Sequence, residues 1–201
     1  MLLVDDPIDG QRVDGGCETT QEAAVNIAAV KHGIIEYVYA IRELGKEYAS
    51  DIKLYVGFEA EYIPEFFKEQ KAMFDRLGCD YMIMGQHFMK SEQTGPYTGT
   101  PTDDESRIRE YVDTVIEGMK TGMYSYLAHP DLINYQGLDS VYEWEMTRMC
   151  KALKELDIPL EINMLGISAG KHYPTERFWC IPHDIGNKVI LGLDAHTVDN
   201  I

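Results

Sequence analysis

The residues best suited to chemistry in this chain are carboxylates and imidazoles that stand where short apolar segments end. Glu59, His87 and His129 each follow such a segment, and Asp194 and His196 follow the last one. Carboxylates and imidazoles are common ligands of divalent metals in proteins. Four such motifs in series therefore predict a metal site that several segments build together.

A strand–helix alternation would bring these residues together. Short continuous apolar runs predict strands over residues 52–57, 81–85, 124–128, 158–163 and 188–193. Between them, the spacing of apolar residues predicts helices over 64–78, 105–122, 140–157 and 175–186. Before them, a helix is expected to start near Thr20, with a candidate break at Gly33.

The pattern indicates one α/β domain that spans residues 1–201. Continuous apolar strands are typical of a parallel sheet covered on both faces. An open doubly wound sheet and a (β/α) barrel both fit the alternation. The barrel is favoured because candidate polar residues follow nearly every strand, and barrels build their sites from several strand ends at one face.

The ligand candidates also predict a reaction class. Asp194 and His196 are two residues apart, so they share a face on an extended strand or reach different metals on a tight turn. Glu59 is the natural carboxylate to bridge two metals. A metal cluster lowers the pKa of bound water from 15.7 to about 7 and neutralises charge on phosphoryl oxygens. The set therefore predicts a metal-dependent hydrolase of phosphate esters.

Composition excludes several other classes. The net charge of −16 over 201 residues argues against binding a nucleic-acid backbone. The acidity fits a solvated surface, and bound metal could offset part of it. No apolar run has the length of a membrane span, and the first residues turn acidic too soon for a signal peptide. Four cysteines lack metal-site spacing, which indicates reduced thiols in a cytoplasmic protein: Cys17, Cys79, Cys150 and Cys180.

Five motifs follow one another along the chain: GFEAEY, MGQHFM, AHPDL, LEIN and GLDAH. In this order they resemble the PHP (polymerase and histidinol phosphatase) superfamily. The stretch from LEIN through the Tyr173-Pro174 pair resembles its histidinol-phosphatase branch. The resemblance, from about Gly33 onward, implies a distorted (β/α)7 barrel with a trinuclear site for Zn, Mn or Fe. It also implies hydrolysis of L-histidinol phosphate to L-histidinol and phosphate in histidine biosynthesis.

The resemblance further implies roles for particular residues. Glu59 would bridge two metals, and His87 and His129 would complete one of them. Asp194 would join Glu59 on the second metal, and His196 would serve the third. Glu59, Asp194 and His196 are accordingly the expected catalytic residues.

The substrate-binding candidates come from the segment that follows LEIN. Glu161 and Asn163 are expected to orient ligands or contact substrate. Relatives often carry Arg where this chain has Ser168, so another cation would have to compensate. The candidates for substrate binding are Asn163, Lys171, His172 and Arg177.

The chain departs from the family pattern at both ends. Neither the family's His-x-His motif on the first strand nor its Asp-His pair on the second is present, and the chain stops soon after GLDAH. These departures predict an incomplete barrel, fewer than three metals and weak turnover. The expected partner is a small phosphorylated metabolite, with the oligomeric state left open. The alternatives are another phosphoesterase of the superfamily, acting on nucleotides or sugar phosphates, and a weakly active metal-binding remnant.

Overall fold

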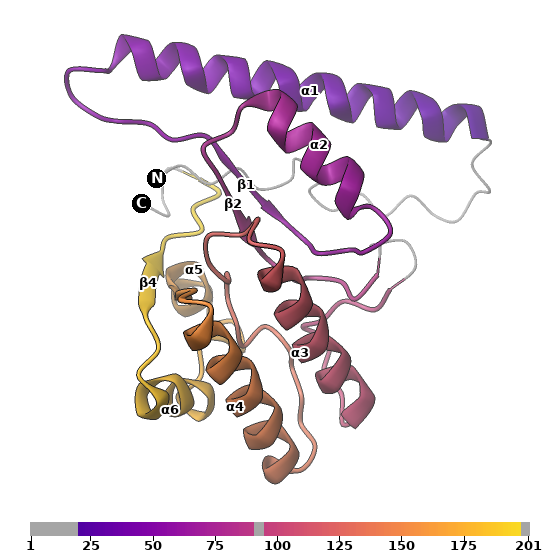
Figure 1. The fold of residues 1–201 in the computed structure, drawn as a ribbon, viewed down its shortest axis with the longest axis vertical. Helices are drawn as coiled ribbons and strands as arrows, with labels where there is room; N and C mark the ends of the chain where they lie inside the picture. The colour runs from indigo at the N-terminus through magenta and orange to yellow at the C-terminus, as the bar shows by residue number, and fades with distance from the viewer. Residues whose placement is uncertain (1–19, 91–94, 198–201) are drawn as a thin grey trace.

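Six helices and four short strands make up the described residues, 20–90 and 95–197, in the computed structural model (Figure 1). Side chains are described from residue 33 onward. The helices are α1 (Thr20–Glu47), α2 (Phe67–Leu77), α3 (Glu105–Lys120), α4 (Asp139–Glu155), α5 (Met164–Ser168) and α6 (Glu176–Ile185). The strands are β1 (Gly57–Ala60), β2 (Tyr81–Met84), β3 (Leu160–Asn163) and β4 (Val189–Gly192). The expected mixed α/β organisation is therefore present, although α3 and α4, and likewise α5 and α6, follow each other without a strand between them.

The strands are parallel, which places their carboxyl ends at one edge. β1 pairs with β2, and β3 pairs with β4. Between the two pairs, Leu127 forms parallel bridges to Met84 of β2 and to Leu160 of β3. The order across the protein is therefore β1, β2, the Leu127 segment, β3 and β4. Side chains at the end of each member can meet in one place.

Two strand predictions need correction. The segment 52–57 was expected to be a strand, but β1 begins only at Gly57, where pairing with Tyr81 starts. Ile52 and Tyr55 are about half exposed, and no strand in the described part of the chain pairs with this segment before Gly57. The segment 124–128 was also expected to be a strand, and it forms only isolated bridges at Leu127.

The segment 124–128 still bonds to both neighbours through its backbone. The Ser125 amide donates to the Met82 carbonyl oxygen at 2.7 Å, and the Glu161 amide donates to the Leu127 carbonyl oxygen at 2.9 Å. These bonds hold the segment between β2 and β3 as a strand would.

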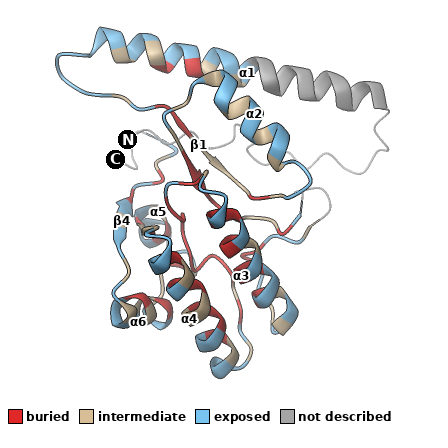
Figure 2. Cartoon of the chain, in the orientation of Figure 1, coloured by how far each residue is buried: buried red, intermediate tan, exposed pale blue. Residues whose placement is uncertain are grey.

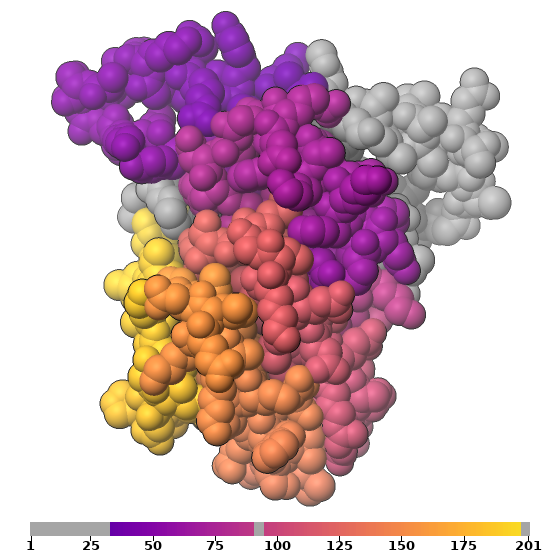
Figure 3. Space-filling view, viewed as in Figure 1, coloured from indigo at the N-terminus to yellow at the C-terminus, as the bar shows by residue number. Residues whose placement is uncertain are grey.

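The predicted break in the first helix is wrong, because α1 continues through Gly33. A single glycine lowers helix stability by about 1 kcal/mol relative to alanine, which does not by itself end a helix. α1 lies at one end of the molecule, next to α2 (Figure 3). A small cluster of Val38, Ile41 and Val56 packs it against the segment before β1.

The main core lies between the strands and the inner faces of α3 and α4, which pack against each other (Figure 2). Ile108 and Tyr111 of α3 and Met146 of α4 are fully buried there. α6 packs on the other side of α4 and contributes Phe178. Among the described helices, none combines the length and the apolar character needed to cross a membrane.

Leu127 should contribute strongly to the stability of this core, because it is fully buried between β2 and β3. Leu127→Ala should lower the free energy of unfolding by about 2–5 kcal/mol through lost burial and an unfilled cavity. Urea unfolding followed by circular dichroism measures this change. Leu44→Ala is the control, because Leu44 is 46% exposed and its loss should change stability by about 0.5 kcal/mol or less. Equal losses for the two variants would contradict this account of the core.

Candidate metal centre

Glu59, His87 and His129 meet in one cluster, with one potential ligand atom from each lying within 4.8 Å of the others. Glu59 Oε1 lies 3.0 Å from His129 Nε2 and 3.6 Å from His87 Nε2. The two imidazole rings have centroids 4.8 Å apart. One carboxylate oxygen therefore faces two imidazole nitrogens, which is the arrangement of a metal site.

The parallel strands bring these residues together. Glu59 lies in β1, opposite Ile83 of β2, and His87 follows β2 by three residues. His129 comes directly after the segment that Leu127 anchors. Each residue therefore stands at or near the carboxyl end of a neighbouring member of the sheet.

Electrostatics in the cluster favours a charged Glu59. Burial raises the pKa of Glu59, but the attraction and hydrogen bond of His129 outweigh it, and the pKa is lowered. For His129, burial lowers the pKa, but the attraction of Glu59 prevails and raises it to about 9. Burial and the charge of His129 lower the pKa of His87 to about 4. The metal-free cluster at neutral pH thus holds a carboxylate beside one charged and one neutral imidazole.

Gly85 leaves the space that the Glu59 carboxylate occupies. A Cβ atom at residue 85 would collide with Oε1, Cδ and Cγ of Glu59. The Glu59 side chain is only 7% exposed, so it has little room to move aside. The glycine directly after β2 is therefore part of the site, although it has no ligand atom.

The cluster opens into a cavity of about 830 Å³. Asp194 and His196 line the same cavity. His196 Nδ1 lies 2.8 Å from the Asp194 backbone carbonyl oxygen and 3.7 Å from Asp194 Oδ1. Asp194 and His196 thus stand beside the cluster of Glu59, His87 and His129 without belonging to that group of three.

The substrate-binding candidates divide into those that line the cavity and those that do not. Lys171 lines it and is the only lysine or arginine among its described lining residues. Its Nζ lies 3.1 Å from the hydroxyl oxygen of Tyr173, another lining residue. Asn163 is buried, and both its amide nitrogen and its amide oxygen are hydrogen-bonded within the protein.

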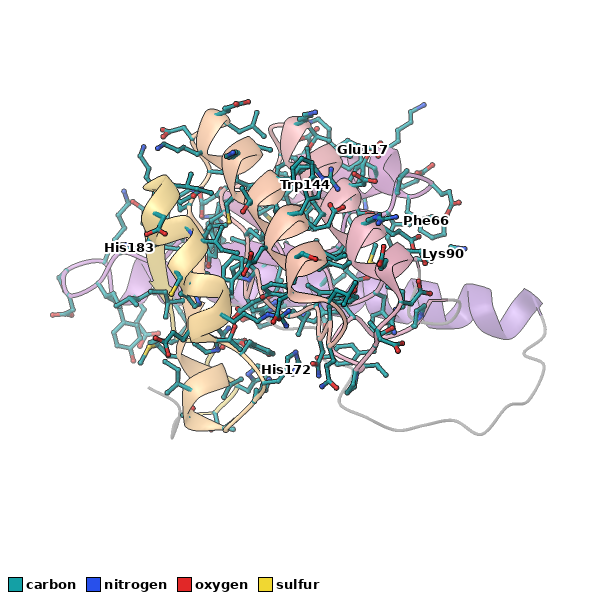
Figure 4. The ribbon with its side chains drawn as sticks, turned by 90° about the horizontal axis from the view of Figure 1, so that it is seen from below. Phe66, Lys90, Glu117, Trp144, His172 and His183 are labelled. Carbon is teal, nitrogen blue, oxygen red and sulfur yellow. The ribbon has the colours of Figure 1, made fainter. Side chains whose placement is uncertain are left out.

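His172 and Arg177 are engaged elsewhere. His172 lies on the connection between α5 and α6 (Figure 4), and its Nε2 lies 2.8 Å from the Leu132 carbonyl oxygen. The Arg177 guanidinium donates to the Tyr135 carbonyl oxygen and pairs with Asp139 at 2.6 Å. Neither is among the residues that line the cavity.

Sequence reasoning missed three residues of the site: Glu61, Gly85 and Tyr173. Glu61 lies two residues after Glu59, and its Oε1 is 3.8 Å from His87 Nδ1. Its position could have been found from the period of two along a strand. The Tyr173 ring lies 5.6 Å from that of His129. For Gly85, the motif MGQHFM contained the residue, but the close approach of Glu59 is visible only in three dimensions.

The donor set fits a divalent metal. Two imidazoles and one carboxylate match catalytic zinc sites, in which three protein ligands leave a fourth position open. His87 Nδ1 near Glu61 resembles the carboxylate–histidine–metal arrangement that orients a ligating imidazole. The fold and the site together define an α/β protein with a candidate metal centre at its strand ends.

The chain belongs to the PHP domain family, which residues 14–164 match. This range contains Glu59, His87 and His129, whereas Asp194 and His196 lie beyond it. The predicted superfamily is therefore confirmed. No curated protein is significantly similar to the chain.

Two solved structures share the fold. One is a candidate histidinol phosphatase, HisK, from Listeria monocytogenes, with a TM-score of 0.67 and 18% identity. The match covers 84% of this chain and 73% of that protein. The other is histidinol phosphate phosphatase from Lactococcus lactis complexed with zinc, L-histidinol and phosphate, with a TM-score of 0.61 and 22% identity. It is matched over 81% of this chain and 66% of its own length.

Gly85→Ala tests the geometry of the cluster. The added methyl group should displace the Glu59 carboxylate and weaken the binding of zinc by about 10- to 100-fold, the usual cost of disturbing the surroundings of a metal ligand. Isothermal titration calorimetry of the full chain measures the affinity. Gly45→Ala is the control, since a Cβ there meets only Leu54 at an ordinary 3.7 Å. Zinc affinity unchanged in Gly85→Ala would contradict the proposed position of Glu59.

Proposed function

We propose that the chain is a divalent-metal-dependent phosphomonoesterase that hydrolyses L-histidinol phosphate to L-histidinol and phosphate. The observation that carries this proposal is the cluster of Glu59, His87 and His129 in a cavity at the strand ends. The PHP family match supports the metal-dependent class. The fold shared with a histidinol phosphate phosphatase that binds zinc, L-histidinol and phosphate supports the substrate.

Glu59, His87 and His129 would hold one metal ion in this proposal. A bound divalent metal supplies a Lewis acid, which lowers the pKa of water and neutralises charge on phosphoryl oxygens. Glu59 contributes the negative charge that favours cation binding, and Glu61 faces His87 Nδ1 and can hold that ring in place. Zn, Mn and Fe all accept such donors.

Asp194 and His196 extend the candidate site. They line the cavity beside the first cluster, which supports a second metal that Glu59 and Asp194 share. Among the described residues, His196 is the one side chain assigned to a third metal, and a single imidazole would hold an ion only weakly. We infer that fewer than three metals bind.

Lys171 is the proposed phosphate-binding cation. It is the only lysine or arginine among the described lining residues, and the Tyr173 hydroxyl beside it offers a second hydrogen-bond donor. Burial raises the pKa of Tyr173, so this hydroxyl stays protonated near neutral pH. The bonds that His172 and Arg177 make elsewhere make Lys171 the stronger candidate.

We further infer that the chain forms a single domain and that its parallel strands are part of a distorted (β/α)7 barrel. The parallel order from β1 to β4 through Leu127 supports this architecture. A small phosphorylated metabolite is the proposed partner, and a cytoplasmic location is proposed for the enzyme.

Phosphate release from L-histidinol phosphate, with added Mn²⁺ or Zn²⁺, tests the proposed function. Glu59→Gln should lower the rate by roughly 100-fold or more, since a lost ligand should cost at least as much as a disturbed outer-shell partner. Glu65→Gln is the control, because Glu65 is exposed and lies outside the cavity lining.

Three outcomes would contradict the proposal. Equal rates for Glu59→Gln and Glu65→Gln would show that Glu59 has no role in the reaction. Faster turnover of nucleotides or sugar phosphates than of L-histidinol phosphate would favour another phosphoesterase of the family. Metal binding without turnover of any of these substrates would instead indicate a metal-binding remnant.

Lys171→Gln should raise KM for L-histidinol phosphate by roughly 10- to 100-fold, the worth of a charge-assisted hydrogen bond. Inhibition by inorganic phosphate should weaken by a similar factor, while zinc affinity stays unchanged. Steady-state kinetics measure both effects. Lys188→Gln is the control, since Lys188 pairs with Asp157 at 2.6 Å and does not line the cavity. A Lys171→Gln enzyme with unchanged KM and phosphate inhibition would contradict this role.

A further inference from the structure

Two side chains of β3, Glu161 and Asn163, connect separate parts of the candidate metal centre. Glu161 Oε2 accepts a hydrogen bond from the His129 backbone amide at 3.0 Å. It also accepts one from Asn163 Nδ2 at 3.2 Å, and the same Nδ2 donates to Asp194 Oδ2 at 2.9 Å. A chain of hydrogen bonds therefore runs from His129 through β3 to Asp194.

Glu161 and Asn163 are not placed to contact substrate. Each is 1% exposed, and neither is among the residues that line the cavity. Asn163 Oδ1 is also occupied, because it accepts the Gly166 amide at 2.7 Å. Their polar atoms face the protein interior, which indicates a role in holding other residues.

The two residues that this series of hydrogen bonds connects, His129 and Asp194, have an unusual backbone conformation. His129 has φ of 29° and Asp194 has φ of 51°, both in the left-handed region that non-glycine residues rarely adopt. Such conformations persist only where the surroundings hold them. The bond to the His129 amide and the bond to the Asp194 side chain supply two such constraints.

We propose that Glu161 is a positioning residue: it holds His129 directly, and Asp194 through Asn163, in the geometry that binds metal. The role in metal binding rests on the proposed function, because it assumes that His129 and Asp194 are ligands. The role in holding the His129 backbone is independent of that assumption.

The two carboxylate oxygens of Glu161 differ in their hydrogen bonding. Glu161 Oε1 is buried and has no hydrogen-bond partner among the residues that the structure describes, whereas Oε2 accepts both bonds. A glutamine can keep its carbonyl oxygen at the position of Oε2 and place its NH₂ at the position of Oε1. Glu161→Gln should therefore preserve both bonds, and Glu161→Ala should remove them.

The first experiment measures the zinc affinity of the full chain by calorimetry. Glu161→Ala should weaken zinc binding by about 10- to 100-fold, and Glu161→Gln should stay within a few-fold of the unchanged protein. Glu145→Ala is the matched control, because Glu145 is a buried glutamate that pairs with Arg148 away from the site. It should change stability while zinc affinity stays the same.

The comparison of Glu161→Gln with Glu161→Ala distinguishes a role of the hydrogen bonds of Glu161 from a role of its charge. If Glu161→Gln binds zinc as poorly as Glu161→Ala, the charge of Glu161 matters rather than its hydrogen bonds, and the positioning role is overturned. Where Glu161→Ala does not fold, Gly192→Ala replaces it. A Cβ at residue 192 would collide with the Glu161 carboxylate and should displace it.

The second experiment needs no metal. Hydrogen exchange of the His129 amide should be at least 10-fold faster in Glu161→Ala than in Glu161→Gln or Glu145→Ala, because only the first loses the acceptor. Equal exchange in all three would overturn the proposal. If the unchanged chain binds no metal, the proposed function fails, and the exchange result alone then decides whether Glu161 holds His129.

Discussion

The contact on which the site depends is the approach of one buried carboxylate oxygen, Glu59 Oε1, to the Nε2 atoms of two imidazoles. Burial of a carboxylate costs free energy unless opposite charge or hydrogen bonds compensate. The raised pKa of His129 indicates that a proton on this ring supplies the compensation in the metal-free protein. A divalent cation would take the place of that proton and carry a larger positive charge. The desolvation that destabilises the buried carboxylate on its own therefore favours metal binding.

The surrounding fold satisfies the geometric demands of this contact. Parallel strands bring Glu59, His87 and His129 to one edge, although they are far apart in sequence. The fully buried Leu127 anchors the segment before His129 between β2 and β3. Gly85 leaves room for the carboxylate itself. The core under α3 and α4 and the metal centre are therefore parts of one arrangement.

Much of this arrangement could be predicted from the sequence. Apolar segments that end in Glu59, His87 and His129 predicted both the α/β alternation and the group that the structure brings together. The ordered motifs also predicted the PHP family correctly. These features are local, because strand patterns and ligand residue types can be read along the chain.

The remaining features depend on contacts between segments that are distant in the sequence. The start of β1 at Gly57 depends on pairing with Tyr81, and no pattern within 52–57 reveals it. The bond of Glu161 to the His129 amide and the clearance at Gly85 depend on approaches across the sheet. Lys171 could be preferred to Arg177 as the candidate phosphate-binding residue only once the structure showed that Arg177 pairs with Asp139.

Anomalous X-ray diffraction at the zinc edge, from crystals of the full chain soaked with zinc, tests the central claim most directly. The account predicts a peak about 2.0–2.2 Å from a carboxylate oxygen of Glu59 and from one ring nitrogen each of His87 and His129. A chain with ordered zinc elsewhere, and no peak among these three residues, would contradict it.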